Sequence, residues 1–552
     1  MHKASSGASS EHNHKRVLSA ASHTSGKNHT HAEHHRKHAV NKEDLKEGLI
    51  DKYDFVSNSI PVRITVEKKD DEFVPVCNVQ ISQISDTTGA ILEKIRRELI
   101  KQVNLGIVDI QDVKKKNIVS EQFEMTISLL LDRYFPDIEN ENKQFLKAYL
   151  VQQSLGMGDV EILMNDPNLE EIAVNGSYES VWVYHKKHGW LKTNVKIEND
   201  DQIKHYATMI GRKVGRQISV LEPLLDAHLN EGDRANATLY PISSKGNTIT
   251  LRKFSRDPWT ITKFIESNTM SVDSAALVWM SIHYELSAII AGGTASGKTS
   301  ALNVLANFFP PNQRIISIED TREIRLPKFL HWIPMSTRNA NAEGKGEVSM
   351  EDLLVNALRQ RPDRILVGEV RRKREAETLF EAIHTGHSCY ATFHANNAEE
   401  AIKRLTNKPI EVPKNMVNAV SLMIIQFRNR RTGLRRTFQL AEIDENGDPN
   451  VLLQYDAKKD VMNKMRESKS LYDTLGLYTG CSRKEINHMI EEKKDVLKYL
   501  VKNKVYTVDD VGRIMAEYYT NKDNLMRFVK SGKPFFEPRD VNKEIKDKVK
   551  IP

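Results

Sequence analysis

Hydrophobic positions recur with two different spacings along the chain, and together these spacings predict an α/β protein. Alternation of apolar and polar residues predicts strands at 60–66, 74–81 and 181–184, because neighbouring side chains of a strand point to opposite faces. Apolar residues three and four positions apart predict amphipathic helices at 90–103 and 122–131. Short, almost wholly apolar runs follow between residues 288 and 393, and these are typical of buried strands in a parallel sheet.

The patterns and the breaker residues divide the chain into six predicted segments. They are a disordered, histidine-rich tail (1–43), an N-terminal docking domain without recognisable chemistry (44–158), a second, smaller α/β domain (159–256), a linker (257–271), the main α/β domain (272–445) and a helical extension (446–552). The linker is indicated by Asp257-Pro258, a pair that interrupts regular structure. In the extension, Ser482 and Thr507 are the predicted N-caps of two helices.

Composition limits the class of protein without selecting one. Nine of the 19 histidines lie in residues 1–40, so weak transition-metal binding is one interpretation of the tail and a solvated segment without a core is the other. The net charge of +7 is compatible with an anionic membrane surface or with nucleic acid. The three cysteines form no CxxC pair, which predicts a reducing, cytosolic setting without disulfides. Neither a signal peptide nor a transmembrane helix is expected, so membrane association would be peripheral.

One stretch carries the clearest chemistry. The apolar run Ala288–Ala291 leads into Gly292-x-x-x-x-Gly297-Lys298-Thr299, and a helical segment follows. This order is typical of a phosphate-binding P-loop, in which backbone N–H groups converge on phosphate oxygens. Lys298 is expected to reach the β- and γ-phosphates of ATP, and the Thr299 hydroxyl to bind Mg²⁺. The predicted nucleotide-binding residues are Gly292, Gly293, Thr294, Ala295, Ser296, Gly297, Lys298, Thr299 and Ser300.

Three further apolar runs end in polar residues, and this common placement predicts one site. Glu319 ends the first run, Glu369 the second and His394 the third. Ligands bind at the carboxyl ends of the strands in parallel α/β sheets, so these residues are expected beside the P-loop. Glu369 is expected to hold the Mg²⁺ shell with Thr299, and Glu319 to be the general base, although the two carboxylates can exchange roles. His394, and with it His387, is a candidate sensor of the γ-phosphate.

Arginines crowd two regions, and each cluster has two interpretations. Those between 359 and 374 form either a charged helix face or a subunit interface that supplies charge to a neighbour's phosphates. Those between 428 and 436 flank Thr432-Gly433 and predict a solvated hairpin, with contact to lipid headgroups or a partner as the alternative. Arg234 and Arg252 lie in the second α/β domain, and each taken alone is typical of a solvated surface arginine.

The motifs in this order resemble one family, the secretion-system ATPases of type II and type IV machines, and within it the archaeal branch that drives type IV pilus and archaellum assembly. The matching stretches are Gly292–Thr299, Ile318-Glu-Asp-Thr-Arg322 (similar to the aspartate box), Val367-Gly-Glu-Val-Arg371 (similar to the atypical Walker B motif) and Thr385-Gly-His387 through His394 (similar to the histidine box). Weaker similarity extends upstream to Gly232-Asp-Arg234 and Ile249–Phe254. The tetracysteine zinc element of bacterial type II members is missing from the sequence, as expected for the archaeal or type IV branch.

The resemblance implies a RecA-like P-loop ATPase domain preceded by a smaller α/β domain, assembled into a homo-hexameric ring. ATP would bind between the two domains, where Arg234 and Arg252 would contact the γ-phosphate. The implied partners are a polytopic membrane platform protein and, indirectly, a pilin-like or secreted substrate. The implied location is the cytoplasm, peripheral to the inner face of the cell membrane, and the cargo stays open between pilus, archaellum and secretion.

Two other functions fit parts of the sequence. A nucleic-acid translocase or RNA-binding RecA-like ATPase would also use a P-loop ring, but no interleaved basic and aromatic residues predict base stacking, so nucleic acid is not an expected partner. A scaffold that binds ATP only to assemble is expected to have lost some of the residues needed for hydrolysis, whereas Lys298, Glu319, Glu369 and His394 are all present.

Overall fold

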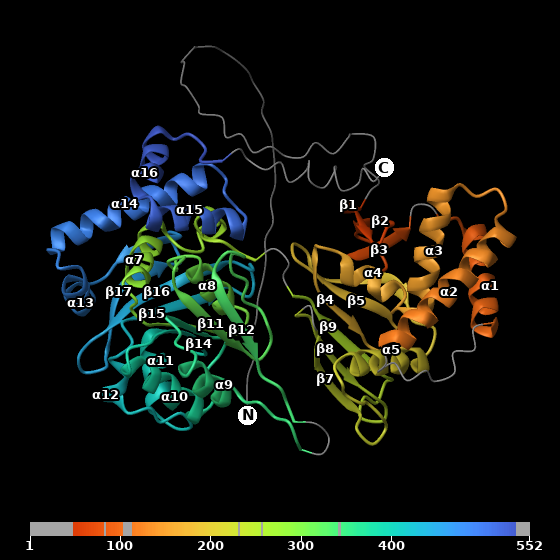
Figure 1. Ribbon diagram of the computed structural model, residues 1–552, viewed down its shortest axis with the longest axis horizontal. Helices are drawn as coiled ribbons and strands as arrows, with labels where there is room; N and C mark the ends of the chain where they lie inside the picture. The colour runs from red at the N-terminus through yellow and green to blue at the C-terminus, as the bar shows by residue number, and fades with distance from the viewer. Residues whose placement is uncertain are drawn as a thin grey trace, which may run out of the picture. The chain divides into compact units, whose positions relative to one another are not determined.

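The computed structural model describes residues 48–536 apart from 82–83, 103–112, 230–231, 255–257 and 341–343. The predicted histidine-rich tail (1–43) lies outside the described residues. Within them, two nine-stranded sheets and the helices around each sheet build the fold, which confirms the predicted α/β class (Figure 1).

The first sheet combines strands from both predicted N-terminal domains. In sheet order β1-β2-β3-β6-β5-β4-β9-β8-β7, the strands are β1 (Leu49–Ser57), β2 (Ile60–Glu67), β3 (Val76–Ile81), β6 (Gly189–Lys196), β5 (Ser180–His185), β4 (Leu169–Val174), β9 (Thr248–Arg252), β8 (Arg234–Thr238) and β7 (Leu224–His228). Neighbours are antiparallel except β3 and β6, whose parallel pairing of Val76 with Lys192 joins the two segments. The sheet is therefore continuous across the predicted boundary at 158–159.

Helices cover one face of the first sheet. They are α1 (Asp86–Gln102), α2 (Val113–Tyr134), α3 (Asn140–Leu155), α4 (Asp159–Asn165) and α5 (Asp200–Lys213). The alternation seen in the sequence explains which face is covered, because every second residue of β2 from Ile60 to Val66 is buried and the residues between are only half buried. The buried positions share one hydrophobic core with Ile95 of α1, Phe123 of α2 and Leu163 of α4.

The second sheet begins as a parallel sheet and ends as an antiparallel one. In sheet order, its strands are β12 (His331–Ser336), β11 (Arg314–Glu319), β13 (Arg364–Val367), β14 (Ser388–Phe393), β10 (Ala288–Gly292), β15 (Leu422–Arg428), β16 (Arg435–Ile443), β17 (Pro449–Asp456) and β18 (Val461–Lys464). Pairing is parallel from β12 to β15 and antiparallel from β15 to β18. The predicted extension at 446–552 thus starts with two strands that continue this sheet.

Both faces of the second sheet are buried under helices. The helices of this part are α6 (Ile261–Glu266), α7 (Val272–His283), α8 (Lys298–Ala306), α9 (Met350–Leu358), α10 (Lys373–His384), α11 (Ala398–Thr406), α12 (Lys414–Val417), α13 (Ser470–Thr479), α14 (Arg483–Lys502), α15 (Val508–Thr520) and α16 (Lys522–Ser531). Ile290 of β10 packs in one core with α7, α8 and α14, whereas the adjacent Ile289 packs in another with α9, α10 and α11 (Figure 1). Two covered faces explain why β10 has no polar alternation.

The C-terminal helices complete one of these cores through a cluster of aromatic residues. Trp279 of α7 stacks on Phe308 with 5.4 Å between ring centroids, and its Nε1–H donates to the Tyr519 hydroxyl at 2.7 Å. The Tyr519 hydroxyl in turn donates to the carbonyl of Phe308 at 2.6 Å. Lys493 of α14 lies over the Trp279 ring, with Nζ 5.3 Å from its centroid. Helices α14 and α15 therefore form part of the same folded core as helix α8, which follows the glycine-rich loop.

Local signals for the helix starts are confirmed. The Ser482 hydroxyl accepts the N–H of Glu485, and the Glu485 carboxylate accepts the N–H of Ser482, which is the capping box predicted for α14. Thr507 caps α15 by accepting the N–H of Asp510. None of the described helices is long and apolar enough to cross a membrane.

Truncation of the buried aromatic cluster should destabilise the fold. Phe308 is completely buried and stacked on Trp279, so Phe308→Ala leaves a cavity and is expected to lower the free energy of unfolding by about 3–5 kcal/mol. Urea unfolding followed by tryptophan fluorescence measures this change. The matched control is Phe73→Ala, because Phe73 is fully exposed and its truncation should alter the free energy by less than about 0.5 kcal/mol. Equal effects of the two substitutions would contradict the packing described here.

Candidate active site

The loop between β10 and α8 is shaped by glycines at its two ends. A Cβ at Gly292 would lie 2.4 Å from the Ser296 Oγ and 2.5 Å from the Gln426 carbonyl, so only glycine fits there. Gly297 has a φ of 92° and occupies the N-cap position of α8, where it offers no side chain to the helix. The N–H groups of the first turn of α8 are therefore left for an anion, which is the geometry of a phosphate-binding loop.

Lys298 begins α8 and folds back over this loop. Its Nζ lies 3.2 Å from the Gly293 carbonyl and 3.4 Å from Nδ1 of His394. Burial of the side chain lowers the pKa of Lys298, and the nearby Glu369 carboxylate opposes this change. Among the other predicted loop residues, Thr294 and Ala295 are exposed and Thr299 and Ser300 are half buried.

The strand ends bring the predicted acidic and histidine residues together. Strands β11, β13, β14 and β10 are consecutive neighbours in the sheet, so their carboxyl ends meet at one edge. Nε2 of His394 lies 2.7 Å from Oε1 of Glu369. Arg371 contacts both Glu369 and Asp320. Its Nε donates to Oε2 of Glu369 at 3.0 Å, and its Nη1 donates to Oδ2 of Asp320 at 2.9 Å. A chain of polar contacts therefore runs from Lys298 through His394, Glu369 and Arg371 to Asp320.

Glu319 lies apart from this chain of contacts and in a different environment. Its side chain is almost completely buried, and Oε1 accepts the N–H groups of Glu323 at 2.8 Å and Ile324 at 2.9 Å. Oε2 has no hydrogen-bond partner among the described residues. Burial raises the pKa of Glu319 from 4.5 to about 7, although the two backbone N–H groups act in the opposite direction. The site thus holds two carboxylates in contrasting surroundings, a common basis for different roles in acid–base chemistry.

The two histidines predicted for this site separate in the structure. His394 follows the carboxyl end of β14, whereas His387 precedes its amino end, where Nδ1 lies 3.2 Å from the Thr385 hydroxyl. The inclusion of His387 in the site was therefore wrong, because a six-residue strand lies between the two rings. Burial and the charge of Lys298 lower the pKa of His394, whereas the Glu369 carboxylate, whose Oε1 lies 2.7 Å from Nε2, acts in the opposite direction.

Arg234 and Arg252 are direct neighbours on the first sheet. They form a cross-strand pair between β8 and β9, and both side chains are exposed. Like charges in this position repel each other, and Asp226 offsets the repulsion by binding both Nε and Nη2 of Arg234 at 3.0 and 2.8 Å. Arg252 keeps a looser contact, with Nη2 3.7 Å from Oε1 of Glu323. The structure thus brings the two predicted arginines together.

The arginine clusters of the sequence contain residues with very different positions. Arg364 is fully buried, and its Nη2 donates to the Ile282 carbonyl at 2.8 Å, so it belongs to the core rather than to a charged helix face. Arg435 belongs to the predicted solvated hairpin but contacts the glycine-rich loop: its Nε donates to the Ala295 carbonyl at 3.2 Å. No local pattern in the sequence indicates this contact, because it depends on the pairing of β16 beside β15 and β10.

Comparisons with known proteins point to one group. A sequence profile of the family described as "Type II/IV secretion system protein" matches residues 156–448, just over half of the chain. An uncharacterised protein of Methanocaldococcus jannaschii is 32% identical over 424 residues, which cover 75% of this chain and 74% of that protein. The type IV secretion system protein PtlH of Bordetella pertussis is 30% identical over 261 residues, 43% of this chain and 76% of that protein. The structure of the Legionella pneumophila ATPase DotB is 17% identical, with a TM-score of 0.39 and coverage of 65% of this chain and 94% of that chain.

The buried carboxyl group of Glu319 should make stability depend on pH. Its pKa of about 7 exceeds the ordinary value of 4.5, so the native state holds a proton that the unfolded chain releases. The associated stability is fully present below pH 4.5 and is lost as the pH rises through about 7. Glutamine does not titrate, so Glu319→Gln does not lose this stability as the pH rises. The free energy of unfolding of the variant minus that of wild type should therefore increase by up to about 3 kcal/mol between pH 4.5 and about 7 and then stay constant.

Urea unfolding at a series of pH values measures this difference. Glu347→Gln is the matched control, since Glu347 is exposed and its loss should leave the pH dependence unchanged. Parallel curves for Glu319→Gln and wild type would contradict the raised pKa.

Proposed function

The chain belongs to the type II/IV secretion system protein family, and from this premise we propose that it is an ATP-hydrolysing motor, assembled as a homo-hexamer. The motor would power assembly of a type IV pilus-like filament or type II/IV protein secretion at the cytoplasmic membrane. The observation that carries this proposal is that Lys298, His394 and Glu369 are in contact beside a glycine-shaped loop, and that Glu319 ends a strand at the same carboxyl edge of the parallel sheet.

The residues present fit ATP as the substrate and Mg²⁺ as its companion ion. Gly297 leaves the first turn of α8 open to phosphate oxygens, and Lys298 adds a positive charge beside it. Thr299 and Glu369 offer hydroxyl and carboxylate oxygens, the donor type that Mg²⁺ prefers. When bound, the ion neutralises negative charge on the phosphates. Gly292–Ser300 would hold the phosphates, with the loop fixed by the hydrogen bond from the Ser296 hydroxyl to the Gly293 carbonyl at 2.8 Å.

The two carboxylates support different roles in hydrolysis. Glu319 would be the general base, because a pKa of about 7 suits proton transfer near neutral pH and its Oε2 has no partner among the described residues. Glu369 would orient the Mg²⁺ shell, since His394 and Arg371 already fix its carboxylate from two sides. His394 links Glu369 to Lys298 and would respond to the γ-phosphate at this point. Arg234 and Arg252 would stabilise charge on the γ-phosphate.

The proposed partners follow from the names of the relatives and from the family. PtlH is a type IV secretion system protein. We therefore propose a polytopic membrane platform protein as the docking partner, at the inner face of the cell membrane. A pilin-like subunit, an archaellum subunit or a secreted protein would be moved indirectly through this platform.

The proposal predicts ATP hydrolysis that depends on Lys298 and responds to a membrane surface. Wild-type protein should hydrolyse ATP, and anionic lipid vesicles should stimulate the rate while single-stranded DNA should not. Lys298→Ala should abolish activity because the phosphates lose their cationic contact. Glu319→Gln should reduce kcat by about 100- to 10,000-fold through loss of the base.

The steady-state rates of the three proteins with each additive separate the alternatives. Stimulation by DNA alone, and steeper at low salt, would indicate a nucleic-acid translocase instead. A wild-type rate equal to that of Lys298→Ala under all conditions would contradict hydrolysis by the isolated chain.

Arg435 provides a second test that concerns the shape of the P-loop. Its hydrogen bond to the Ala295 carbonyl joins the β15–β16 hairpin to the loop, so Arg435→Ala should loosen the loop and raise KM for ATP about tenfold, with a smaller change in kcat. Arg430→Ala is the matched control, since Arg430 is exposed in the same hairpin. Arg435→Lys should rescue little, because lysine cannot reproduce the guanidinium geometry. Unchanged KM in Arg435→Ala would refute this role.

A further inference from the structure

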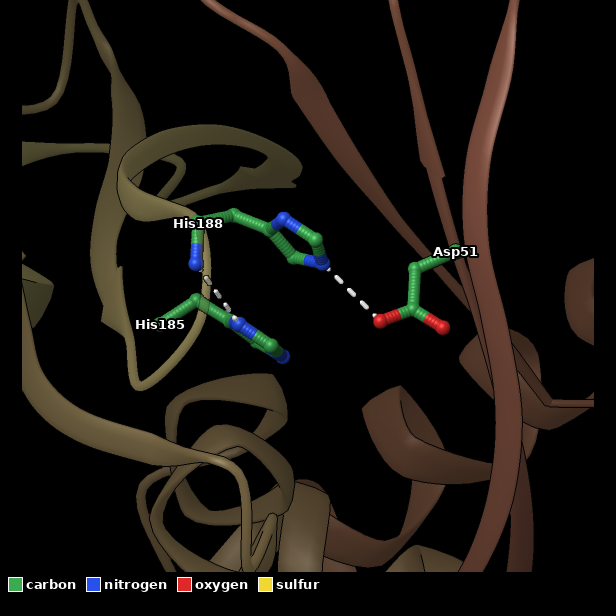
Figure 2. A group of neighbouring side chains, drawn as sticks. All are labelled: Asp51, His185 and His188. Atoms are coloured by element: carbon green, nitrogen blue, oxygen red, sulfur yellow. Dashed lines mark hydrogen bonds and ion pairs between the residues drawn. The ribbon is translucent and has the colours of Figure 1, made fainter. Parts of the chain in front are cut away.

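Among the described residues, three side chains of metal-binding type converge in the first sheet, outside the candidate active site. His185 ends β5 and His188 lies three residues later in the turn to β6, while Asp51 comes from β1. Figure 2 shows the two imidazole rings on one side and the Asp51 carboxylate opposite them. Nε2 of His188 lies 2.9 Å from Oδ2 of Asp51, and one ligand atom from each residue lies within 4.8 Å of the others.

The burial of His185 needs an explanation that the protein fold alone does not supply. Its side chain is 1% exposed, and Nε2 has no hydrogen-bond partner among the described residues. Nδ1 accepts the backbone N–H groups of Lys187 at 3.1 Å and His188 at 3.3 Å, which leaves the ring proton on Nε2. A buried donor without an acceptor destabilises the folded state, and such groups are rare in native proteins.

We propose that Asp51, His185 and His188 form a binding site for a divalent transition-metal ion, with Zn²⁺ as the preferred ion. Two imidazole nitrogens and one carboxylate oxygen are ligands that zinc commonly takes, and a water molecule completes such sites. The short His-x-x-His spacing places both rings on one turn, where they stack with 4.7 Å between centroids. One ligand atom of each residue lies within 4.8 Å of the others, so a movement of the turn that reorients the stacked rings would bring the three atoms to one ion.

Two features of the site oppose metal binding: protons on the ligands and the ammonium group of Lys187. A metal ion at Nε2 of His185 takes the place of the ring proton, which either leaves the protein or moves to Nδ1 as the turn releases its two hydrogen bonds. The proton that Nε2 of His188 donates to Asp51 is displaced in the same way, to Nδ1 or to solvent. Lys187 also faces the site, with Nζ 3.9 Å from Oδ2 of Asp51, and it competes with the ion for the carboxylate. Because the Lys187 side chain is largely exposed, it can turn into solvent when the ion binds.

A bound ion would tie distant parts of the first sheet together. Asp51 belongs to β1 at one edge of the sheet, whereas the histidines belong to the β5–β6 turn, more than 130 residues later in the sequence. In the metal-free state this link includes the Asp51–His188 contact and the looser contact of Asp51 with Lys187. Metal binding should therefore stabilise the first sheet against unfolding, independently of any reaction at the P-loop.

The test must separate this site from the histidine-rich tail. A full-length background variant therefore carries Gln in place of each tail histidine, at positions 2, 12, 14, 23, 29, 31, 34, 35 and 38. Zn²⁺ affinity is measured by competition with a chromophoric chelator, and Co²⁺ absorption spectra report the ligand geometry. We expect one equivalent of Zn²⁺ per chain, release of protons on binding, and a higher unfolding temperature with the metal.

Substitutions of the more accessible ligands decide the outcome. Asp51→Asn and His188→Gln in this background should each weaken Zn²⁺ binding at least tenfold, while His205→Gln, which removes an exposed histidine of α5, should have no effect. Unfolding temperatures without metal verify that each variant is folded. The proposal is overturned if the background variant binds no stoichiometric Zn²⁺, which would assign metal binding to the tail, or if the folded Asp51→Asn and His188→Gln variants bind Zn²⁺ as tightly as their background.

Discussion

The parallel strands β10, β11, β13 and β14 are buried on both faces, and this burial determines where polar side chains can lie. Nearly every residue of these strands is enclosed, and the helices α7 and α8 on one face and α9–α11 on the other leave no room for exposed polar side chains along them. Charged groups are costly in such surroundings unless they are paired. Polar chemistry is therefore confined to the strand ends, and because the strands are parallel, four such ends lie at one edge.

The same constraint separates the two acidic residues. Glu319 is the last residue of β11 and stays inside the sheet, where two backbone N–H groups are its polar partners and burial raises its pKa. Glu369 lies two residues beyond the end of β13, far enough out to meet His394 and Arg371. Gly368 allows this arrangement, since a Cβ there would lie 3.3 Å from the Cα and Cγ of Glu319. A difference of two positions relative to the strand end thus places the two carboxylates in different surroundings.

The segments after the parallel strands support the site from outside it. Helix α14 and the Tyr519 hydroxyl of α15 hold Trp279 and Phe308, which back the P-loop helix α8. The β15–β16 hairpin carries Arg435 to the Ala295 carbonyl on the opposite side of the loop. The C-terminal extension is therefore part of the packing that fixes the loop, and not an independent appendage.

Local spacing was enough to predict the α/β class and the residues that end the apolar runs, because these depend on hydrophobic periodicity and on the rule that parallel strands present their carboxyl ends together. It also fixed the helix caps at Ser482 and Thr507, where the signal lies within four residues. Three other features became visible only in the folded chain: His387 lies at the amino end of β14, Arg435 contacts the Ala295 carbonyl, and Asp51 lies beside two histidines. These outcomes depend on strand pairing between residues far apart in the chain, and the energy of such pairing is not encoded in any short stretch of sequence.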